Sequence, residues 1–276
     1  MSERDGFEPG VPCWVDTLQP DPEAALSFYS RLFGWDFEGS GPRPGDPVGE
    51  YNVARLRGRD VAGVATQPAE GGPPAWNTYV QVQSADDAVA KAQREGGSVL
   101  VEPFDAQPAG RGAVVADPEG AAFCLWEPGQ RKGAHVVNEP GAWAMSALNT
   151  RDPERAEDFY GKLFGWTTEA FDLGGAEIKM WRLPGFVGGE PEQPVARDVV
   201  ATMATMKGED FPEDVPAHWS VDFWTEDVDA AAQAASESGG KVIAPPFDIP
   251  DIGMRTAVLG DPQGATFSVT KVGATG

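Results

Sequence analysis

The chain repeats itself over most of its length, and this duplication is the strongest constraint on its fold. A helix-like segment that begins at Asp21 and ends at Trp35 recurs between Asp152 and Trp166, at an offset of 131 residues. Later motifs recur at offsets of 143 and 144 residues, including the turn at 117–121 and its copy at 261–265. Solenoid repeats have periods of about 20–50 residues, so this pattern predicts two tandem copies of one whole domain.

Length and charge limit the function. A chain of 276 residues is long enough for two domains that each bury a core. The net charge of −22 argues against nucleic acid as a partner, because phosphate binding needs clustered Lys and Arg. An acidic surface favours a cationic or neutral small-molecule ligand over an anionic one. The alternative is that the charge only keeps the protein soluble.

Compartment signals favour a cytoplasmic protein. No apolar run reaches the ~18 residues of a membrane span, so we expect no membrane partner. The first residues lack the basic end and apolar stretch of a signal peptide. Two cysteines, Cys13 and Cys124, do not make a disulfide framework in a chain of this length.

Local signals predict the same element order four times. Asp21 is a typical helix N-cap, Pro22 suits the first helical position, and Gly34 is a typical helix stop. Strand-like runs follow, and the pattern restarts at Trp76 and again in the second copy. Each domain is therefore predicted to contain two βαβββ modules. We expect domain one at 8–128, a linker at 129–141 and domain two at 142–272, with an extra Gly/Pro/Glu-rich loop at about 186–197.

The repeated motifs resemble the vicinal oxygen chelate superfamily, which includes glyoxalases, bleomycin-resistance proteins and extradiol dioxygenases. The resemblance covers most of both copies. The two-domain arrangement is similar to that of tandem actinobacterial proteins labelled hydroxylases or glyoxalase-like antigens. It extends to accessory proteins of anthracycline biosynthesis. It implies an α+β fold in which paired βαβββ modules form a cupped, eight-stranded mixed sheet with helices outside. A biosynthetic enzyme as partner is also implied.

Metal-dependent members of this superfamily carry His, Gln or Glu on the first strand of each module and on the last strand of the domain. In the first copy these positions are occupied by Trp14, Asn77 and Cys124, and in the second by Met145, Ser220 and Ser268. None of these sets is a carboxylate–imidazole site, so we expect no metal and no cofactor. His218 is expected to lie one residue out of phase with the ligand-bearing face, as a hydrogen-bonded or exposed histidine at a strand entry.

Alternation along the strands predicts which side chains line each cup. The predicted lining mixes aromatic rings with a few hydrogen-bonding groups, as organic-ligand pockets do. Its members are Trp14, Asp16, Asn77, Tyr79, Gln81, Cys124 and Trp126 in domain one, and Met145, Asn149, Ser220, Asp222, Trp224 and Ser268 in domain two. The two sets differ, which predicts unequal cups. Ordinary packing is the alternative role for these rings, and a satisfied buried carboxylate is the alternative for each aspartate.

Two functional hypotheses follow. The first is a metal-independent binding protein that holds a flat hydrophobic natural product, including a cationic aromatic one, for sequestration, self-resistance or an accessory biosynthetic role. The second is a metal-independent lyase, isomerase or hydroxylase-type enzyme that uses Asp16 or Asp222 as general base. A metal-dependent glyoxalase is a third alternative.

Overall fold

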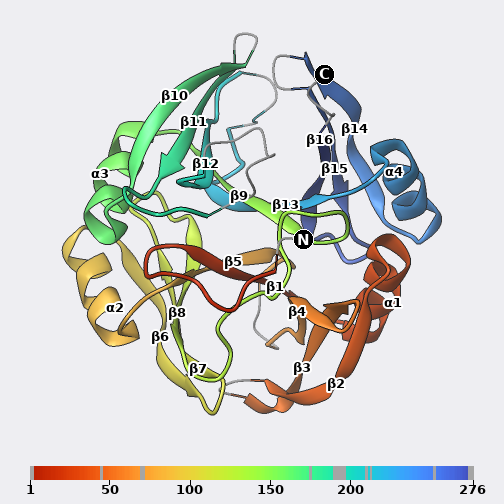
Figure 1. Cartoon of the computed structure of the whole chain (residues 1–276), viewed down its shortest axis with the longest axis horizontal. Coiled ribbons are helices and arrows are strands. Elements are labelled where there is room, and N and C mark those ends of the chain that lie inside the picture. Colours follow the sequence, from red (N-terminus) through yellow and green to blue (C-terminus); the bar gives the residue numbers. More distant parts are fainter. Residues whose placement is uncertain are drawn as a thin grey trace.

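A computed structural model shows two eight-stranded mixed sheets, one from each copy (Figure 1). The structure describes residues 3–43, 46–68, 72–173, 176–188, 197–208, 211, 213–250 and 253–272. The first copy contains β1 (Pro12–Gln19), α1 (Pro22–Phe33), β2 (Asp36–Arg43), β3 (Asp46–Leu56), β4 (Arg59–Thr66), β5 (Trp76–Gln81), α2 (Ala85–Arg94), β6 (Ser98–Ala106), β7 (Gly110–Ala116) and β8 (Ala122–Pro128). The second contains β9 (Trp143–Thr150), α3 (Pro153–Phe164), β10 (Thr167–Leu173), β11 (Ala176–Arg182), β12 (Val199–Thr205), β13 (His218–Trp224), α4 (Val228–Glu237), β14 (Lys241–Ile249), β15 (Met254–Gly260) and β16 (Thr266–Val272).

The two modules of each copy pair within that copy. The strand orders are β2-β3-β4-β1-β5-β8-β7-β6 and β10-β11-β12-β9-β13-β16-β15-β14. At the centre of each sheet the first strands of the two modules run antiparallel, β1 with β5 and β9 with β13. The tandem α+β fold predicted from the sequence is therefore confirmed. Part of the predicted 186–197 loop, residues 189–196, lies outside the described residues.

Local sequence explains where the repeated helices begin and end. The Asp21 carboxylate accepts a hydrogen bond from Ala24 N at 3.1 Å, and Asp152 does the same for Arg155 N. Gly34 and Gly165 end the two helices in the left-handed conformation, which costs glycine little. None of the described helices combines the length and apolar character needed to cross a bilayer.

Each sheet has two faces. The face that packs against the helices is called the outer face here, although it faces the other domain. The opposite face, which carries the predicted cup residues, is called the inner face. The outer faces of the two sheets meet at the centre of the molecule, where the buried hydroxyls of Thr78 and Ser146 lie 2.7 Å apart. The helices fill the sides of this contact, α1 beside α4 and α2 beside α3 (Figure 1). The inner faces therefore point in opposite directions, away from the domain contact.

Residues repeated in both copies reach across this contact. The phenol of Tyr29 donates to Asp261 Oδ2 at 2.9 Å, and the phenol of Tyr160 donates to Asp117 Oδ2 at 3.1 Å. Indole nitrogens add a second reciprocal pair, because Trp35 donates to Gly141 O and Trp166 to Gly10 O, both at 2.7 Å. Each bond joins the first module of one copy to the other copy.

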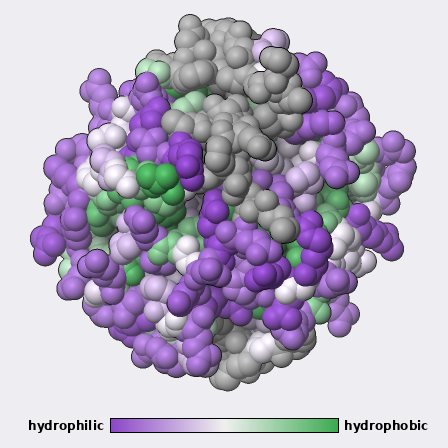
Figure 2. Space-filling view, in the orientation of Figure 1, coloured by the Kyte–Doolittle hydropathy of each residue, from purple (hydrophilic) through white to green (hydrophobic). Residues whose placement is uncertain are grey.

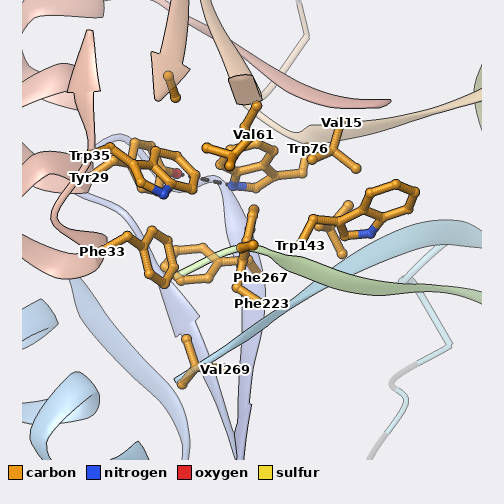
Figure 3. Close-up of a cluster of buried hydrophobic side chains, with 14 of the residues drawn as sticks. Val15, Tyr29, Phe33, Trp35, Val61, Trp76, Trp143, Phe223, Phe267 and Val269 are labelled. Atoms are coloured by element: carbon orange, nitrogen blue, oxygen red, sulfur yellow. Dashed lines mark hydrogen bonds between the residues drawn. The ribbon is translucent and has the colours of Figure 1, made fainter. Parts of the chain in front are cut away.

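Aromatic rings surround these hydrogen bonds. Phe33 of α1 packs against Phe223 of β13 with ring centroids 4.9 Å apart (Figure 3). Trp76 donates to the Tyr29 phenol at 3.1 Å, and both rings contact this cross-domain cluster (Figure 3). Trp35 and Trp166, which end the repeated segment in the two copies, are both almost fully buried. By contrast, the described surface facing the viewer is mainly hydrophilic, and its hydrophobic residues form small separate areas (Figure 2).

The two cross-domain phenols predict unequal mutational costs. Asp261 Oδ2 also accepts from Gln19 Nε2 at 2.7 Å, whereas Asp117 Oδ2 has Tyr160 as its donor among the described residues. Removing the sole donor of a buried carboxylate oxygen costs more than removing one of two. We therefore expect Tyr160→Phe to lower the free energy of unfolding by about 2–3 kcal/mol and Tyr29→Phe by about 1 kcal/mol.

Equilibrium denaturation in guanidinium chloride measures this difference, with Gln93→Ala on the exposed side of α2 as control. Equal costs for the two Tyr→Phe variants, or changes within about 0.5 kcal/mol of zero, would contradict the assigned role of these bonds.

Candidate functional site

The inner face of the first sheet holds a buried carboxylate, Asp16, that accepts its hydrogen bonds from other protein groups. Asp16 Oδ1 accepts from Asn77 Nδ2 at 2.9 Å. Its Oδ2 accepts from the phenols of Tyr79 at 2.7 Å and Tyr51 at 3.0 Å. Burial raises the pKa of this carboxyl, and the three donors oppose that shift. With three protein donors on two oxygens, Asp16 has little capacity left for a ligand.

Protein groups also occupy the aromatic part of this face. Trp14 donates its indole N–H to the Tyr51 phenol at 2.7 Å, and the Arg131 guanidinium lies 5.3 Å from the Trp14 ring centroid. Trp126 stands edge-on to Tyr79 and donates to Arg131 O at 2.9 Å. Trp14 and Trp126 are both buried, so the predicted cup residues come together but largely contact one another.

Two members of this face were missed by sequence reasoning. Tyr51 lies on a middle strand that could not be aligned between the copies, and it fits because a Cβ at Gly63 would overlap its hydroxyl. Arg131 lies in the linker, where side-chain alternation makes no prediction. Burial raises the pKa of the Cys124 thiol well above its usual value, so Cys124 is not a reactive thiolate.

The inner face of the second sheet carries a less satisfied acid. Asp222 is half-buried and pairs in register with Met145 on β9 and Ser268 on β16. Thr270 donates to Asp222 Oδ1 at 2.6 Å. Within the described ranges no donor reaches Oδ2, so one carboxylate oxygen is available to a ligand.

Apolar and small polar side chains surround Asp222. Met145, Met180 and Trp224 are half-buried on the same face, as judged from strand alternation and register. Burial raises the pKa of Asp222 to about 7, with the Thr270 hydrogen bond opposing the shift. This carboxyl therefore changes charge near neutral pH, and it is bordered by a thioether and an indole that suit a flat apolar ligand.

The remaining predicted residues of the second copy hold the strands together. Asn149 donates to Ser220 Oγ at 3.1 Å, and Ser220 Oγ donates to Ala147 O at 3.3 Å. The predicted phase of His218 is wrong. His218 pairs with Asn149, two residues along β13 from Ser220, and two residues is a full strand repeat that returns to the same face. Its Nδ1 lies 2.9 Å from Pro216 O, which ties the ring to the strand entry.

The residues at the superfamily's metal positions do not fit a divalent ion. Asp16, which neighbours these positions on β1, already accepts three protein hydrogen bonds, and Cys124 keeps its proton. His218 and Asp222 are four residues apart on one strand, about 13 Å, so they cannot share an ion. In the described part of the chain no three His, Cys, Asp or Glu side chains are grouped to hold a metal.

Gln81 pairs in register with Trp126 at the end of β5, but its side chain has a different partner. Its side-chain amide donates to the backbone oxygen of Phe7, and it lines a hollow of about 610 Å³ near the N-terminal segment. Asp16 and Asp222 are not part of that hollow. The predicted residues thus form three groups. The first lies on the inner face where Asp16 accepts three protein hydrogen bonds, and the second on the inner face where Asp222 accepts one. Gln81, which lines the hollow, is the third.

Comparison with known proteins supports the fold and its duplication. A family model described as a glyoxalase-like domain matches residues 14–126 and again 145–270. CFP32 of Mycobacterium tuberculosis is 40% identical over 276 residues, covering 98% of each chain. The anthracycline biosynthesis protein DnrV of Streptomyces peucetius is 33% identical over 281 residues, covering 96% of this chain and 94% of DnrV.

Solved structures show the same architecture at low identity. The Mn(II)-bound glyoxalase from Novosphingobium aromaticivorans has a TM-score of 0.62 at 14% identity, covering 95% of this chain and 82% of that one. The 2,3-dioxygenase LapB from Pseudomonas sp. KL28 also has a TM-score of 0.62 at 14% identity, covering 96% and 93%. The repeated motifs, the two sheets and these full-length relatives lead to one conclusion: the chain belongs to the glyoxalase-like domain family of the vicinal oxygen chelate superfamily.

Proposed function

We propose that the chain binds a flat, hydrophobic, cationic organic molecule on the inner face of the second sheet, with Asp222 as the anionic contact. The observation that carries this proposal is the difference between the two inner-face acids. Asp16 accepts three hydrogen bonds from protein groups, whereas Asp222 accepts one from Thr270. A carboxylate with a free oxygen at a half-buried position gains most from a charged donor supplied by a ligand.

The neighbours of Asp222 favour an aromatic ligand body. Trp224 and Met145 offer partly exposed apolar surface beside the carboxylate, and an indole ring contacts both flat rings and cations favourably. The net charge of −22 adds a long-range attraction for cations. Apolar contact and one charged anchor together are the usual composition of a small-molecule site.

The relatives suggest a setting for this binding. DnrV is named as an anthracycline biosynthesis protein, so an accessory role in making a natural product is proposed here, with a biosynthetic enzyme as the partner. Sequestration of such a product, including for self-resistance, uses the same binding step. No metal enters this proposal, because the residues at the metal positions do not fit one.

A second candidate function is catalysis with Asp222 as general base. It is favoured by the pKa of about 7, which suits proton transfer near neutral pH. Asp16 is less suited, since its oxygens already accept protein donors. Mass spectrometry of a bound ligand after incubation separates the two functions. Ligand recovered unchanged supports binding alone, whereas conversion that Asp222→Asn abolishes supports catalysis.

A fixed-charge aromatic probe tests the proposed anchor. Titration of tryptophan fluorescence with 10-methylacridinium at pH 8 should show saturable quenching. Asp222→Asn should weaken binding about 10–100-fold, because an ion contact at about 4 Å contributes about 1–4 kcal/mol between bulk water and a protein surface site. Glu226→Gln, which removes an exposed negative charge four residues away, is the matched control and should bind as the wild type does. If both variants bind the probe equally weakly, the loss comes from the change in net charge, and the proposed contact with Asp222 is contradicted.

Binding of this probe should strengthen as the pH rises. Only ionised Asp222 attracts the cation, and its pKa is about 7 in the folded protein. The association constant should therefore rise about tenfold between pH 6 and pH 8 and level off above pH 8. Because the probe does not titrate, the slope reports on the protein. A pH profile that is flat in the wild type, or unchanged in Asp222→Asn, would contradict the role of Asp222.

A further inference from the structure

The hollow of about 610 Å³ does not include either inner-face acid and takes its walls from both domains. One wall is the N-terminal segment that includes Phe7, and another is the residues just after β8, including Lys132. The second domain contributes the segment after β11, with Phe186, and Arg197 ahead of β12. Volumes of about 300–1,000 Å³ are typical of small-molecule sites, so this hollow has a suitable size.

Two cations on these walls lack carboxylate partners. In the described part of the chain, neither Lys132 nor Arg197 forms an ion pair, although Asp5 and Glu8 also line the hollow. Elsewhere in this acidic chain cations such as Arg111 pair with carboxylates. The walls thus carry the cations Lys132 and Arg197 beside the carboxylates of Asp5 and Glu8, and an anionic ligand group would give these two cations a charged partner.

Local contacts hold the Arg197 side chain and the stem of Lys132. The Arg197 backbone and side chain each bond to Gly188, through Gly188 N to Arg197 O at 2.7 Å and Arg197 Nε to Gly188 O at 3.1 Å. This leaves the terminal guanidinium nitrogens, the pair suited to carboxylate or phosphate oxygens. The stem of Lys132 lies close to Gly6, so its ammonium projects from a supported chain.

Aromatic surface lies beside these charges. The Phe186 ring folds onto Gly188, where a Cβ would overlap it. Phe7 lies against Gly133 in the same way, since a Cβ there would come within 2.7 Å of its ring. Two rings with fixed positions and two cations in one hollow combine flat apolar contact with charge recognition.

We propose that this hollow binds an organic anion with a flat apolar body, through Lys132, Arg197 and the rings of Phe7 and Phe186. A carboxylate, a sulfonate and a phosphate ester share the required chemistry. This site goes beyond the function proposed above, because it prefers the opposite charge and does not involve Asp222. Its ligand would contact both domains and so stabilise their association.

Isothermal titration calorimetry with 2-naphthoate tests the proposal, with 2-naphthyl phosphate and 2-naphthalenesulfonate distinguishing the head group. Lys132→Ala and Arg197→Ala should each weaken 2-naphthoate binding at least about tenfold, as expected for loss of one charge-assisted contact. Neutral 2-naphthalenemethanol should bind more weakly than naphthoate and be unaffected by either change. Raising NaCl from 50 to 500 mM should weaken only the anions.

Arg155→Ala is the matched control, because it removes an exposed cation from α3 that does not line the hollow. Asp222→Asn should bind naphthoate as the wild type does. The test of the hollow is therefore independent of the test of the cation site at Asp222. The proposal is overturned if no naphthyl anion binds the wild type at millimolar concentration. It is also overturned if the Lys132→Ala/Arg197→Ala double variant binds as the wild type does, or if Arg155→Ala weakens binding equally.

Discussion

The reciprocal hydrogen bonds between Tyr29 and Asp261 and between Tyr160 and Asp117 are the interaction on which the rest of the molecule depends. Each joins a helix of one copy to the closing turn of the other, deep in a shared aromatic core. Burial raises the pKa of both phenols, which keeps them protonated as donors. Because both bonds cross the domain contact, the two sheets are held outer face to outer face with their inner faces turned away.

This arrangement explains which residues the two copies share and which they do not. The shared residues at the contact between domains are Tyr29 and Tyr160, Trp35 and Trp166, and Asp117 and Asp261. A change in one would therefore disturb its partner across the interface. The inner faces lie outside that contact and differ freely. On the first inner face, protein side chains form a hydrogen-bond network around Asp16. On the second inner face, the half-buried Asp222 accepts one hydrogen bond, from Thr270. Duplication has thus provided one rigid frame with two unequal faces.

Local and periodic features of the fold were predictable from the sequence. Helix ends followed from Asp21 and Gly34. Alternation also brought Asp16, Asn77 and Tyr79 together, because residues two apart on a strand share a face. The sequence therefore identified the neighbourhoods of both candidate faces.

Contacts between distant segments could not be predicted in this way. Nothing in the spacing shows that Tyr51 closes on Asp16, since that contact depends on strand register and on the space left at Gly63. The partner of Tyr29 lies 232 positions away, so the repeated motif was recognised but its cross-domain role was not. The phase of His218 was predictable, because His218 precedes Ser220 by two residues and two residues return a strand to the same face. Whether the modules pair within or across copies required the sheet order.

A crystal structure of the purified protein soaked with 10-methylacridinium tests the central claim most directly, which is that the inner face of the second sheet binds an organic cation without a metal. Electron density for the ring system beside Trp224 and Met145, with its charged nitrogen facing Asp222, is the predicted result. A stoichiometric divalent ion held by protein side chains on either inner face, or ligand density only on the first sheet, would contradict it.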